Sequence, residues 1–509
     1  MADRTTQKRP NVLVLLPDQQ RPDSLGCYGN GAAITPNIDR LAASGATFNN
    51  CYVQNPLCCP SRYSLATGRY PHSHGVRANW YPPRPGELSF AHQLGRVGYR
   101  TAAIGKMHFT PWHDNFGFDG RIIAEAKFHG DCPDDYAQYL RRHGYRRDQL
   151  YDAKSADYIQ RLTSLTSALP QELHIDSFVG ASVCEYLQRA EDPFFVFASF
   201  LSPHNPYDPP KPYDHLFDRA ELPPRNMAAG EVDRKPREAY DYINTRLGWP
   251  FASDAISEGQ RLDMLRSYYG LNTLIDDWVG RIVETLKERN QYDDTVIVYS
   301  SDHGDLLGDH GLFYKQCFYE QSVKVPLIVH WPARFKPRTV EKPVELMDLY
   351  ATICELAGAD PGPGNQSSSL IPLLDGVPER QSKDAVFSEN YFGRMIRWKD
   401  YKMVYYPGKP YGELYDLAED SREQCNLWDA MEGSPEKRAL KDQLLEWAFS
   451  SEDPLPAPVR GDHFDQSPID FELHRGHSRV KARQHWHLGG FDDLYSDWTF
   501  SVDARTRWP

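Results

Sequence analysis

The sequence predicts an α/β protein that carries a smaller C-terminal α+β unit. Over much of its 509 residues, short apolar runs alternate with longer segments of helical periodicity, a pattern typical of a sheet covered by helices. From about residue 385, closely spaced aromatic-rich runs predict a small antiparallel sheet with one helix. A chain of this length suffices for two domains, or for one large α/β domain with an appendage.

Local signals place the elements of the main unit in order along the chain. Apolar runs predict buried strands at residues 11–16, 194–200, 296–299 and 325–330. A helix is expected over 35–44, with Thr35 as its cap and Pro36 in its first turn. The longest helix is expected over 258–290, where apolar residues recur close to a helical period. A further helix, over 344–358, ends on a glycine.

The C-terminal part of the sequence indicates how the chain divides. A Pro-, Gly- and Ser-rich stretch at 360–369 marks where the main unit begins to close. We expect a main unit at 1–380, a small α+β subdomain at 381–455 and a tail at 456–509. Because the tail is rich in aromatic residues, we expect it to pack on its own domain or on a neighbouring subunit of a homo-oligomer.

Composition and charge exclude several classes of protein. With 57 Lys and Arg against 70 Asp and Glu, the formal net charge is −13, which argues against a nucleic-acid or anionic-membrane binder. No apolar run reaches the ~18–20 residues of a membrane helix. The first apolar run, at 12–16, is too short for a signal peptide, and the nine cysteines lack the density of a disulfide scaffold. We therefore expect a cytoplasmic protein.

Polar side chains directly follow three of the predicted strands. Asp18 follows the first strand, His204 the second, and Asp302 and His303 the third. Ligand sites in open α/β sheets lie at these carboxyl ends, so residues far apart in the sequence can meet there. Two carboxylates with an imidazole suit a divalent cation. The alternative is a pair of aspartates that cap strand-to-loop turns.

Residues 58–69, CCPSRYSLATGR, carry the most specific motif. They resemble the sulfatase signature C-x-P-S-R followed by T-G-R, in which the first cysteine is converted after translation to formylglycine, an aldehyde. By this resemblance Cys58 is the modified residue and Cys59 occupies the variable position. The resemblance also implies a formylglycine-generating enzyme as a partner during maturation. The alternative is a buried cysteine pair at a helix start.

Further segments match the same family in order along the chain. They are GKMH at 105–108, SPH at 202–204, SDHG at 301–304, GDHG at 308–311 with Lys315, and ELYDL at 413–417. The resemblance covers about residues 10–430 and is to type I sulfatases of the alkaline phosphatase superfamily, near the choline-sulfatase and phosphonate monoester hydrolase branches. It implies an alkaline-phosphatase-like fold, with a large mixed sheet between helices and a smaller C-terminal antiparallel sheet plus helix.

The resemblance implies hydrolysis of sulfate monoesters to an alcohol and sulfate. Hydrated formylglycine at position 58 is a geminal diol, so one hydroxyl attacks sulfur and the other, once deprotonated, reforms the aldehyde and expels sulfate. Arg62 would hold the nucleophile, and His108 would take the proton. The residues implied to contact the ester oxygens or to serve the leaving group are Lys106, His204 and Lys315.

One divalent cation is implied beside the nucleophile. Its expected ligands are Asp18, Gln19, Cys58, Asp302 and His303. Gln19 stands where many family members have a second aspartate, and His303 stands where many have asparagine. Ca²⁺ is the first expectation, with Mn²⁺ as the alternative because an imidazole ligand favours softer ions. Gln19 either ligates through its amide oxygen or caps the turn.

Other interpretations of the same residues stay open. The scaffold also supports hydrolysis of phosphonate monoesters or phosphodiesters, although Lys106 and His108 favour sulfate, since neutral hydroxyl side chains tend to occupy those positions in the phosphonate branch. A redox or metal-binding pair at 58–59 is a third hypothesis, but adjacent cysteines lack the usual two-residue spacing. Asn79 either reaches the substrate or forms a turn. The alcohol can be aryl, choline or carbohydrate.

Overall fold

A computed structural model of the chain describes residues 9–127, 134–150, 161–231, 256–362, 364–377 and 383–452. The aromatic tail expected at 456–509 lies outside these described residues. Within the described ranges, no helix combines the length and the apolar character needed to cross a membrane.

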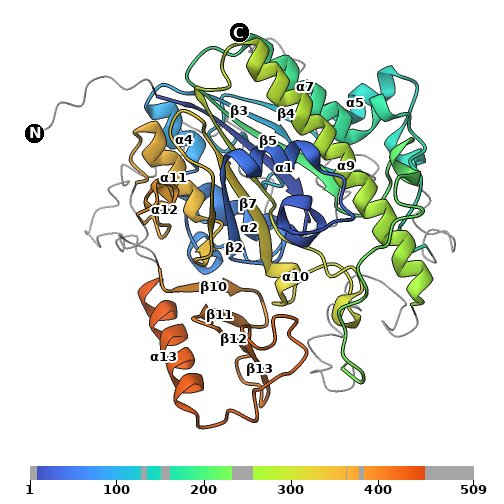
Figure 1. Cartoon of the computed structure of the whole chain (residues 1–509). Coiled ribbons are helices and arrows are strands. Elements are labelled where there is room, and N and C mark those ends of the chain that lie inside the picture. Colours follow the sequence, from blue (N-terminus) through green and yellow to red (C-terminus); the bar gives the residue numbers. More distant parts are fainter. Residues whose placement is uncertain are drawn as a thin grey trace, which may run out of the picture.

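A nine-stranded mixed sheet forms the centre of the described chain (Figure 1). Its strands are β1 (Asn11–Asp18), β2 (Ala46–Tyr52), β3 (Arg100–Gly105), β4 (Gly120–Ile123), β5 (Phe194–Pro203), β6 (Thr295–Ser300), β7 (Lys324–His330), β8 (Arg338–Val340) and β9 (Val344–Glu345). They lie in the order β4-β3-β5-β1-β6-β7-β2-β8, and β9 pairs with β2. From β4 to β6 the strands are parallel, whereas β7 is antiparallel to both of its neighbours. The predicted α/β fold with a large mixed sheet is confirmed.

Helices cover both faces of this sheet (Figure 1). Successive side chains of the fully buried β1 point to opposite faces, as expected of a parallel strand between two helical layers. Leu13 and Leu15 enter the core of the face covered by α1 (Pro36–Ser44), α5 (Asp135–Arg142), α7 (Ile175–Arg189) and α9 (Glu258–Glu288). Val12 and Val14 enter the core of the face covered by α2 (Cys58–Thr67), α4 (Phe90–Arg96) and α11 (Asp348–Ala357).

A four-stranded antiparallel sheet lies at one end of the main sheet, as predicted. Its strands, in order, are β10 (Ala385–Glu389), β11 (Arg394–Trp398), β12 (Tyr401–Tyr405) and β13 (Gly412–Asp416). The helix α13 (Pro435–Ser450) packs on it through Leu440, Leu444 and Trp447. On the other side, the backbone N–H of Phe387 donates to the Glu345 carboxylate of β9 over 2.9 Å, which ties the small sheet to the large one.

Two boundaries differ from those predicted by three residues or more, each for a physical reason. β5 continues to Pro203, three residues past its expected end, since Asp18 of β1 still pairs with Pro203. The helix expected over 344–358 begins only at Asp348, because Val344 and Glu345 pair with β2 instead.

The helix over 35–44 has its expected N-cap residue, but the side chain of that residue does not cap it. Thr35 occupies the cap position, but its hydroxyl accepts from the Gly26 N–H over 3.0 Å rather than from its own helix. The first-turn amides of Asn37 and Ile38 instead donate to the Asp276 carboxylate, which belongs to α9.

Gly105 provides a test of how closely β3 and β5 approach at the edge that carries the site. Its φ is 97°, and an added Cβ would lie 1.9 Å from the Ser199 carbonyl oxygen. Gly29 has a similar φ of 92° but nothing within 4 Å of an added Cβ. We expect Gly29→Ala to cost about 1–2 kcal/mol of backbone strain, and Gly105→Ala to lower the thermal unfolding midpoint much further. Equal midpoints for the two variants would contradict this packing.

Candidate active site

The site residues gather at the carboxyl ends of adjacent parallel strands. Asp18 is the last residue of β1, Lys106 directly follows β3, His204 follows β5, and Asp302 follows β6 after one intervening residue. Because these four strands are neighbours in the sheet, their ends lie along one edge. Segments far apart in the sequence therefore supply one site.

Four buried ligand-type side chains converge at this edge. Atoms of Asp18, Cys58, Asp302 and His303 that can hold a metal ion all lie within 4.8 Å of one another. Cys58 Sγ is 3.1 Å from His303 Nε2 and 4.0 Å from Asp18 Oδ1. His303 Nε2 is 3.8 Å from Asp302 Oδ2 and equally far from Asp18 Oδ1.

The contacts of His303 prepare one of its ring nitrogens for ligation. Nδ1 lies 3.0 Å from the Gly304 carbonyl oxygen, to which it donates a hydrogen bond. This bond leaves Nε2 facing the cluster, the arrangement that orients metal-bound histidines. Burial lowers the pKa of His303, but Asp302 raises it above its ordinary value. A proton and a cation would therefore compete for Nε2.

Arg62 joins the two carboxylates of the site. It lies in α2, one turn after Cys58, and its side chain is almost wholly buried. Nε donates to Asp302 Oδ2 over 2.7 Å and Nη2 to Asp18 Oδ2 over 3.3 Å. Nη1 donates to the Lys106 carbonyl and to Ser199 Oγ, over 2.7 and 2.8 Å. One guanidinium thus contacts residues at or after the ends of β1, β3 and β6 and one residue within β5.

Gln19 and Lys315 contact each other beside Cys58. The Gln19 N–H donates to Asp302 Oδ1 over 3.0 Å, and its amide oxygen accepts from Lys315 Nζ over 2.5 Å. Lys315 Nζ also lies 3.3 Å from Cys58 Sγ. The Gln19 amide nitrogen donates to the Asp305 carboxylate, which accepts from Tyr207 as well. Gln19 therefore connects the cluster to Lys315 and, through Asp305, to Tyr207.

Lys106 and His108 lie in the loop that follows β3. Lys106 Nζ donates to Asp18 Oδ2 over 2.5 Å. His108 is buried, and Nδ1 of its ring has no hydrogen-bond partner among the described residues. The Glu125 carboxylate accepts from the backbone amides of Met107 and His108, over 3.3 and 2.9 Å, and so holds this loop in place.

His204 and Asn79 occupy the margin of the site. The ring of His204 donates from Nδ1 to the Asn205 carbonyl oxygen over 2.6 Å. Asn79 Oδ1 accepts from the Cys59 N–H in the first turn of α2, over 3.0 Å. Asn79 thus supports the start of the helix that carries Cys58.

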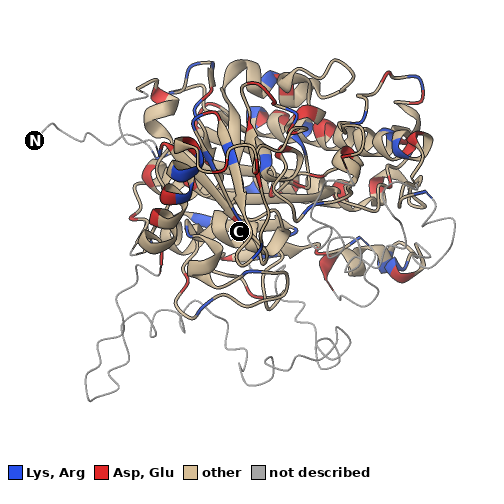
Figure 2. Cartoon of the chain, turned by 90° about the horizontal axis from the view of Figure 1, so that it is seen from below, with Lys and Arg blue, Asp and Glu red and all other residues tan. Residues whose placement is uncertain are grey.

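Lys106, Arg62 and Lys315 lie around the Asp18 carboxylate at this edge, and residues of both signs are interspersed over the described chain (Figure 2). Burial raises the pKa of Asp18, yet Lys106 and the other cations hold it well below its usual range. Burial also raises the pKa of the Cys58 thiol, but Lys315 and its neighbouring cations bring it below its ordinary value.

The two peripheral histidines are neutral for related reasons. Burial, reinforced by Lys106, holds the pKa of His108 well below its ordinary value. Burial and Lys315 do the same for the pKa of His204. Negative charge is therefore stabilised at this edge by lysine and arginine, while the imidazoles are available as proton acceptors.

The donor set fits a divalent cation. Two buried carboxylates, one imidazole nitrogen turned inward by its backbone contact and a fourth group at position 58 make a compact mixed O, N and S cluster. Carboxylates buried in this way need a counter-charge, which Arg62 supplies only in part, since it contacts Oδ2 of each.

Sequence reasoning did not single out several residues that shape the site. Asp305, two positions after His303, receives the Gln19 and Tyr207 hydrogen bonds. Glu125 positions the loop after β3, and the ring of Trp80 lies 4.4 Å from that of His108. Asp305 could have been suspected from its place in the motif, whereas a lone glutamate and a lone tryptophan in loops carry no pattern.

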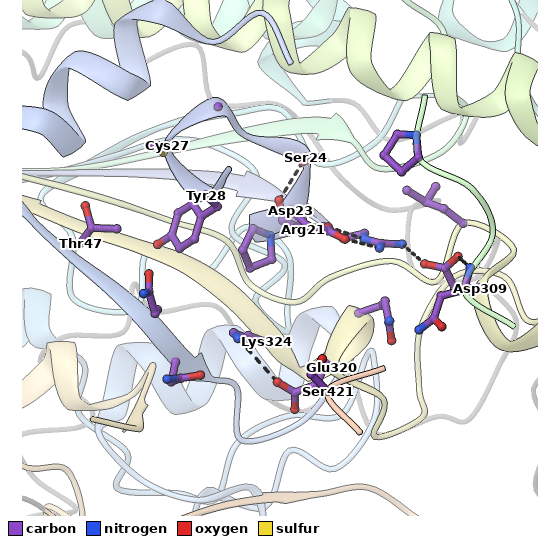
Figure 3. A pocket seen from close by; sticks show the side chains of 18 of the residues that line it. Arg21, Asp23, Ser24, Cys27, Tyr28, Thr47, Asp309, Glu320, Lys324 and Ser421 are labelled. Atoms are coloured by element: carbon purple, nitrogen blue, oxygen red, sulfur yellow. Dashed lines mark hydrogen bonds and ion pairs between the residues drawn. The ribbon is translucent and has the colours of Figure 1, made fainter. Parts of the chain in front are cut away.

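A separate cavity of about 1210 Å³ lies beside Arg21 (Figure 3). Arg21 contributes to its wall and is held by Asp23 and Asp309, the latter at 2.8 Å. Among the described residues, the cavity lining includes none of the predicted site residues. The cavity is therefore not the site described above.

Fold and site together define a hydrolase of the alkaline phosphatase superfamily. The chain belongs to the sulfatase family, since the Sulfatase family model matches residues 10–359. A second model, "N-sulphoglucosamine sulphohydrolase, C-terminal", matches residues 308–449. The family and its named relatives make this protein a sulfuric ester hydrolase.

Similarity to individual proteins extends over most of the chain. An arylsulfatase of Clostridium perfringens is 29% identical over 463 residues, which covers 83% of this chain and 91% of that protein. A choline-sulfatase of Rhizobium meliloti is 28% identical, with 93% and 90% covered. The crystal structure of a phosphonate monoester hydrolase of Agrobacterium radiobacter is similar at a TM-score of 0.73 and 25% identity, with 87% and 95% covered.

Substitution of Arg62 tests whether its hydrogen bonds to Asp18 and Asp302 hold the site together. Arg62→Lys keeps the charge but cannot donate to all four partners, and each buried acceptor left unpaired costs about 1–3 kcal/mol. We expect a lower unfolding midpoint and a large loss of sulfatase activity. Arg100→Lys is the matched control, because Arg100 pairs with Glu191 with both side chains more than half exposed, where a pair is worth about 0–1 kcal/mol. Similar unfolding midpoints for Arg62→Lys and Arg100→Lys would show that the hydrogen bonds of Arg62 do not hold the site together.

Proposed function

We propose that this enzyme hydrolyses sulfate monoesters with a formylglycine made from Cys58 and one divalent cation beside it. The observation that carries this proposal is the position of Cys58. It begins α2, lies in the cluster of Asp18, Asp302 and His303, and has Lys315 3.3 Å from its sulfur. A nucleophile at this point faces both metal ligands and anion-stabilising groups.

Residue 58 is suited to attack an anionic ester. The N-terminal amides of α2 and its dipole favour negative charge there, and Pro60 suits the first turn. As the hydrated aldehyde, residue 58 supplies two hydroxyls on one carbon, one to attack sulfur and one whose deprotonation releases sulfate. Modification requires a formylglycine-generating enzyme during maturation, before Cys58 reaches its buried position.

Asp18, Asp302 and His303 would hold the cation together with residue 58. Gln19 would join them through its amide oxygen, which already faces Lys315. When bound, a divalent cation polarises the sulfuryl oxygens and favours the ionised form of the nucleophile. We propose Ca²⁺ as the ion, with Mn²⁺ as the alternative that the His303 imidazole favours.

The surrounding side chains stabilise charge and transfer protons. Lys106 and Arg62 neutralise charge that develops on the sulfuryl oxygens, an effect worth about 2.7–4 kcal/mol per donor. His108 accepts the proton of the second hydroxyl, in keeping with its lowered pKa and its unbonded Nδ1 among the described residues. Lys315 and His204 serve the leaving-group oxygen.

The nucleophile can be tested by two adjacent substitutions. Cys58→Ala should abolish turnover of sulfate esters, whereas Cys59→Ser should retain it, since a serine hydroxyl can still donate to the His108 carbonyl as Cys59 Sγ does over 3.1 Å. Peptide mass spectrometry should show residue 58 about 18 Da lighter than cysteine. Coexpression with a formylglycine-generating enzyme should raise this fraction and the activity together. Full turnover from an unmodified thiol would refute the proposal.

Metal removal tests the cation independently. Dialysis against a chelator should abolish turnover and lower the unfolding midpoint, because the buried carboxylates lose a counter-charge. Adding back Ca²⁺ or Mn²⁺ in parallel identifies the ion by the midpoint that it restores. Asp302→Asn should weaken this restoration. A chelated enzyme of unchanged activity and midpoint would count against any metal at this site.

A further inference from the structure

Lys127 is a buried cation to which the proposed mechanism gives no part. It lies in the loop after β4, and its side chain is only 2% exposed. Nζ donates to the carbonyl oxygens of His204 and Pro206, over 2.9 and 3.0 Å, and to Asp208 Oδ1 over 2.8 Å. An ammonium group has three protons to donate, and each has an acceptor here. Two of these acceptors are backbone groups on either side of Asn205, in the segment that carries the imidazole of His204.

The segment after β5 has few backbone donors of its own. β5 ends at Pro203, and Pro206 follows, so that two of these four positions lack an N–H. Lys127 supplies the donors for the His204 and Pro206 carbonyls. The His204 ring in turn donates from Nδ1 to the Asn205 carbonyl over 2.6 Å. The orientation of the imidazole therefore depends on a carbonyl that lies between the two carbonyls held by Lys127.

The start of α7 supports this contact from the other side. Asp208 lies 3.6 Å from Nε2 of His174, the N-cap residue of α7. Burial raises the pKa of Asp208, but Lys127 and then His174 bring it to about 2, so Asp208 remains a carboxylate at neutral pH. In the first turn of α7, Asp176 Oδ1 accepts from the N–H groups of residues 201–202, over 2.8 and 3.1 Å. The backbone is thus held both before and after the imidazole.

We infer that Lys127 is a positioning residue that holds the His204 imidazole at the leaving-group oxygen of the sulfate ester. This inference rests on the proposed function, in which His204 serves that oxygen. Because Nδ1 donates to a carbonyl, only Nε2 can serve the ester, and it carries a proton in the imidazolium form. A bound sulfate ester is an anion and favours that form. As the S–O bond breaks, its electron pair stays with the alcohol oxygen, which takes the proton from Nε2.

This role predicts which substrates depend on Lys127. The anion of 4-nitrophenol is a weak base and leaves with little help, whereas the anions of phenol and of 4-methoxyphenol are stronger bases that need the proton. A residue that only stabilises the fold would change the amount of folded enzyme and would affect all esters alike. The dependence of the rate on the leaving group therefore separates positioning from stabilisation.

The test compares 4-nitrophenyl, phenyl and 4-methoxyphenyl sulfates in the formylglycine-containing, metal-loaded enzyme. In Lys127→Met, we expect kcat/KM for the phenyl and 4-methoxyphenyl esters to fall roughly tenfold or more, and kcat/KM for the 4-nitrophenyl ester to fall less than about threefold. His204→Ala should show the same pattern. Equal losses on all three esters in Lys127→Met, or no loss, would overturn the inference.

A double variant tests whether Lys127 acts through His204. Added to His204→Ala, Lys127→Met should lower kcat/KM for phenyl sulfate by less than about twofold, because the imidazole that it positions is already absent. A further loss as large as that of Lys127→Met alone would show that Lys127 acts elsewhere.

Two further variants control for the loss of a buried charge. Lys437→Met is the matched control, because Lys437 is also 2% exposed and donates to the Trp428 carbonyl and to Glu432, in the C-terminal unit. It should lower the unfolding midpoint and leave the leaving-group dependence unchanged. Should Lys127→Met not fold, Lys127→Met with Asp208→Asn removes both charges and still leaves the two carbonyls without their donor. A native leaving-group dependence in that double variant would contradict the positioning role.

The inference and the proposed function fail in different ways. If the modified, metal-loaded native enzyme turns over no sulfate ester, the proposed function fails. If His204→Ala leaves the leaving-group dependence unchanged, the part assigned to His204 fails, and the role of Lys127 fails with it. If His204→Ala changes this dependence but Lys127→Met does not, only the role of Lys127 fails. Equal modification at residue 58 in all variants establishes that their rates are comparable.

Discussion

The two buried carboxylates of Asp18 and Asp302 impose the constraint on which the site depends. Each ends or follows a strand of the central sheet, and neither is exposed to water that could solvate its charge. Arg62 supplies the counter-charge, because it donates to both carboxylates. It also donates to the Lys106 carbonyl after β3 and to the Ser199 hydroxyl within β5. Because Arg62 lies one turn after Cys58 in α2, the same interaction that satisfies the carboxylates also positions Cys58, the nucleophile that we propose.

The charged groups of the site contact different atoms of the two carboxylates. Arg62 and Lys106 contact Oδ2 atoms, while Asp18 Oδ1 and His303 Nε2 face the sulfur of Cys58. One oxygen of Asp18 thus accepts hydrogen bonds from the protein while the other faces Cys58, whereas both oxygens of Asp302 accept, one from Arg62 and one from the Gln19 N–H. Burial holds the pKa of His108 well below its ordinary value, so this imidazole, the proton acceptor that we propose, adds no positive charge. This arrangement suits an ester that arrives as an anion and leaves as a more highly charged one.

Much of the fold and of the site could be predicted from the sequence, because both depend on local patterns. Apolar runs gave the parallel strands, and the polar residue after each run placed Asp18 and Asp302 at one edge. What could not be predicted depends on long-range contacts. Thr35 has the side chain of a helix cap, yet Asp276 of α9 takes that role. The pairing of Val344 with β2, and the support that Glu125 gives to the His108 loop, likewise arise only in the folded chain.

Asn79 illustrates how a loop residue supports the helix that carries Cys58. From the sequence, it could reach the substrate or form a turn; the structure places it in a turn and adds a side-chain bond to the first turn of α2. The bond connects this loop to the start of the helix that carries Cys58, and the next residue, Trp80, contacts the His108 ring. Loss of the Asn79 amide oxygen would therefore leave the Cys59 N–H unpaired, because a first-turn amide has no acceptor within its own helix. The sequence of this loop is thus constrained by the helix that positions residue 58, whatever else the loop contacts.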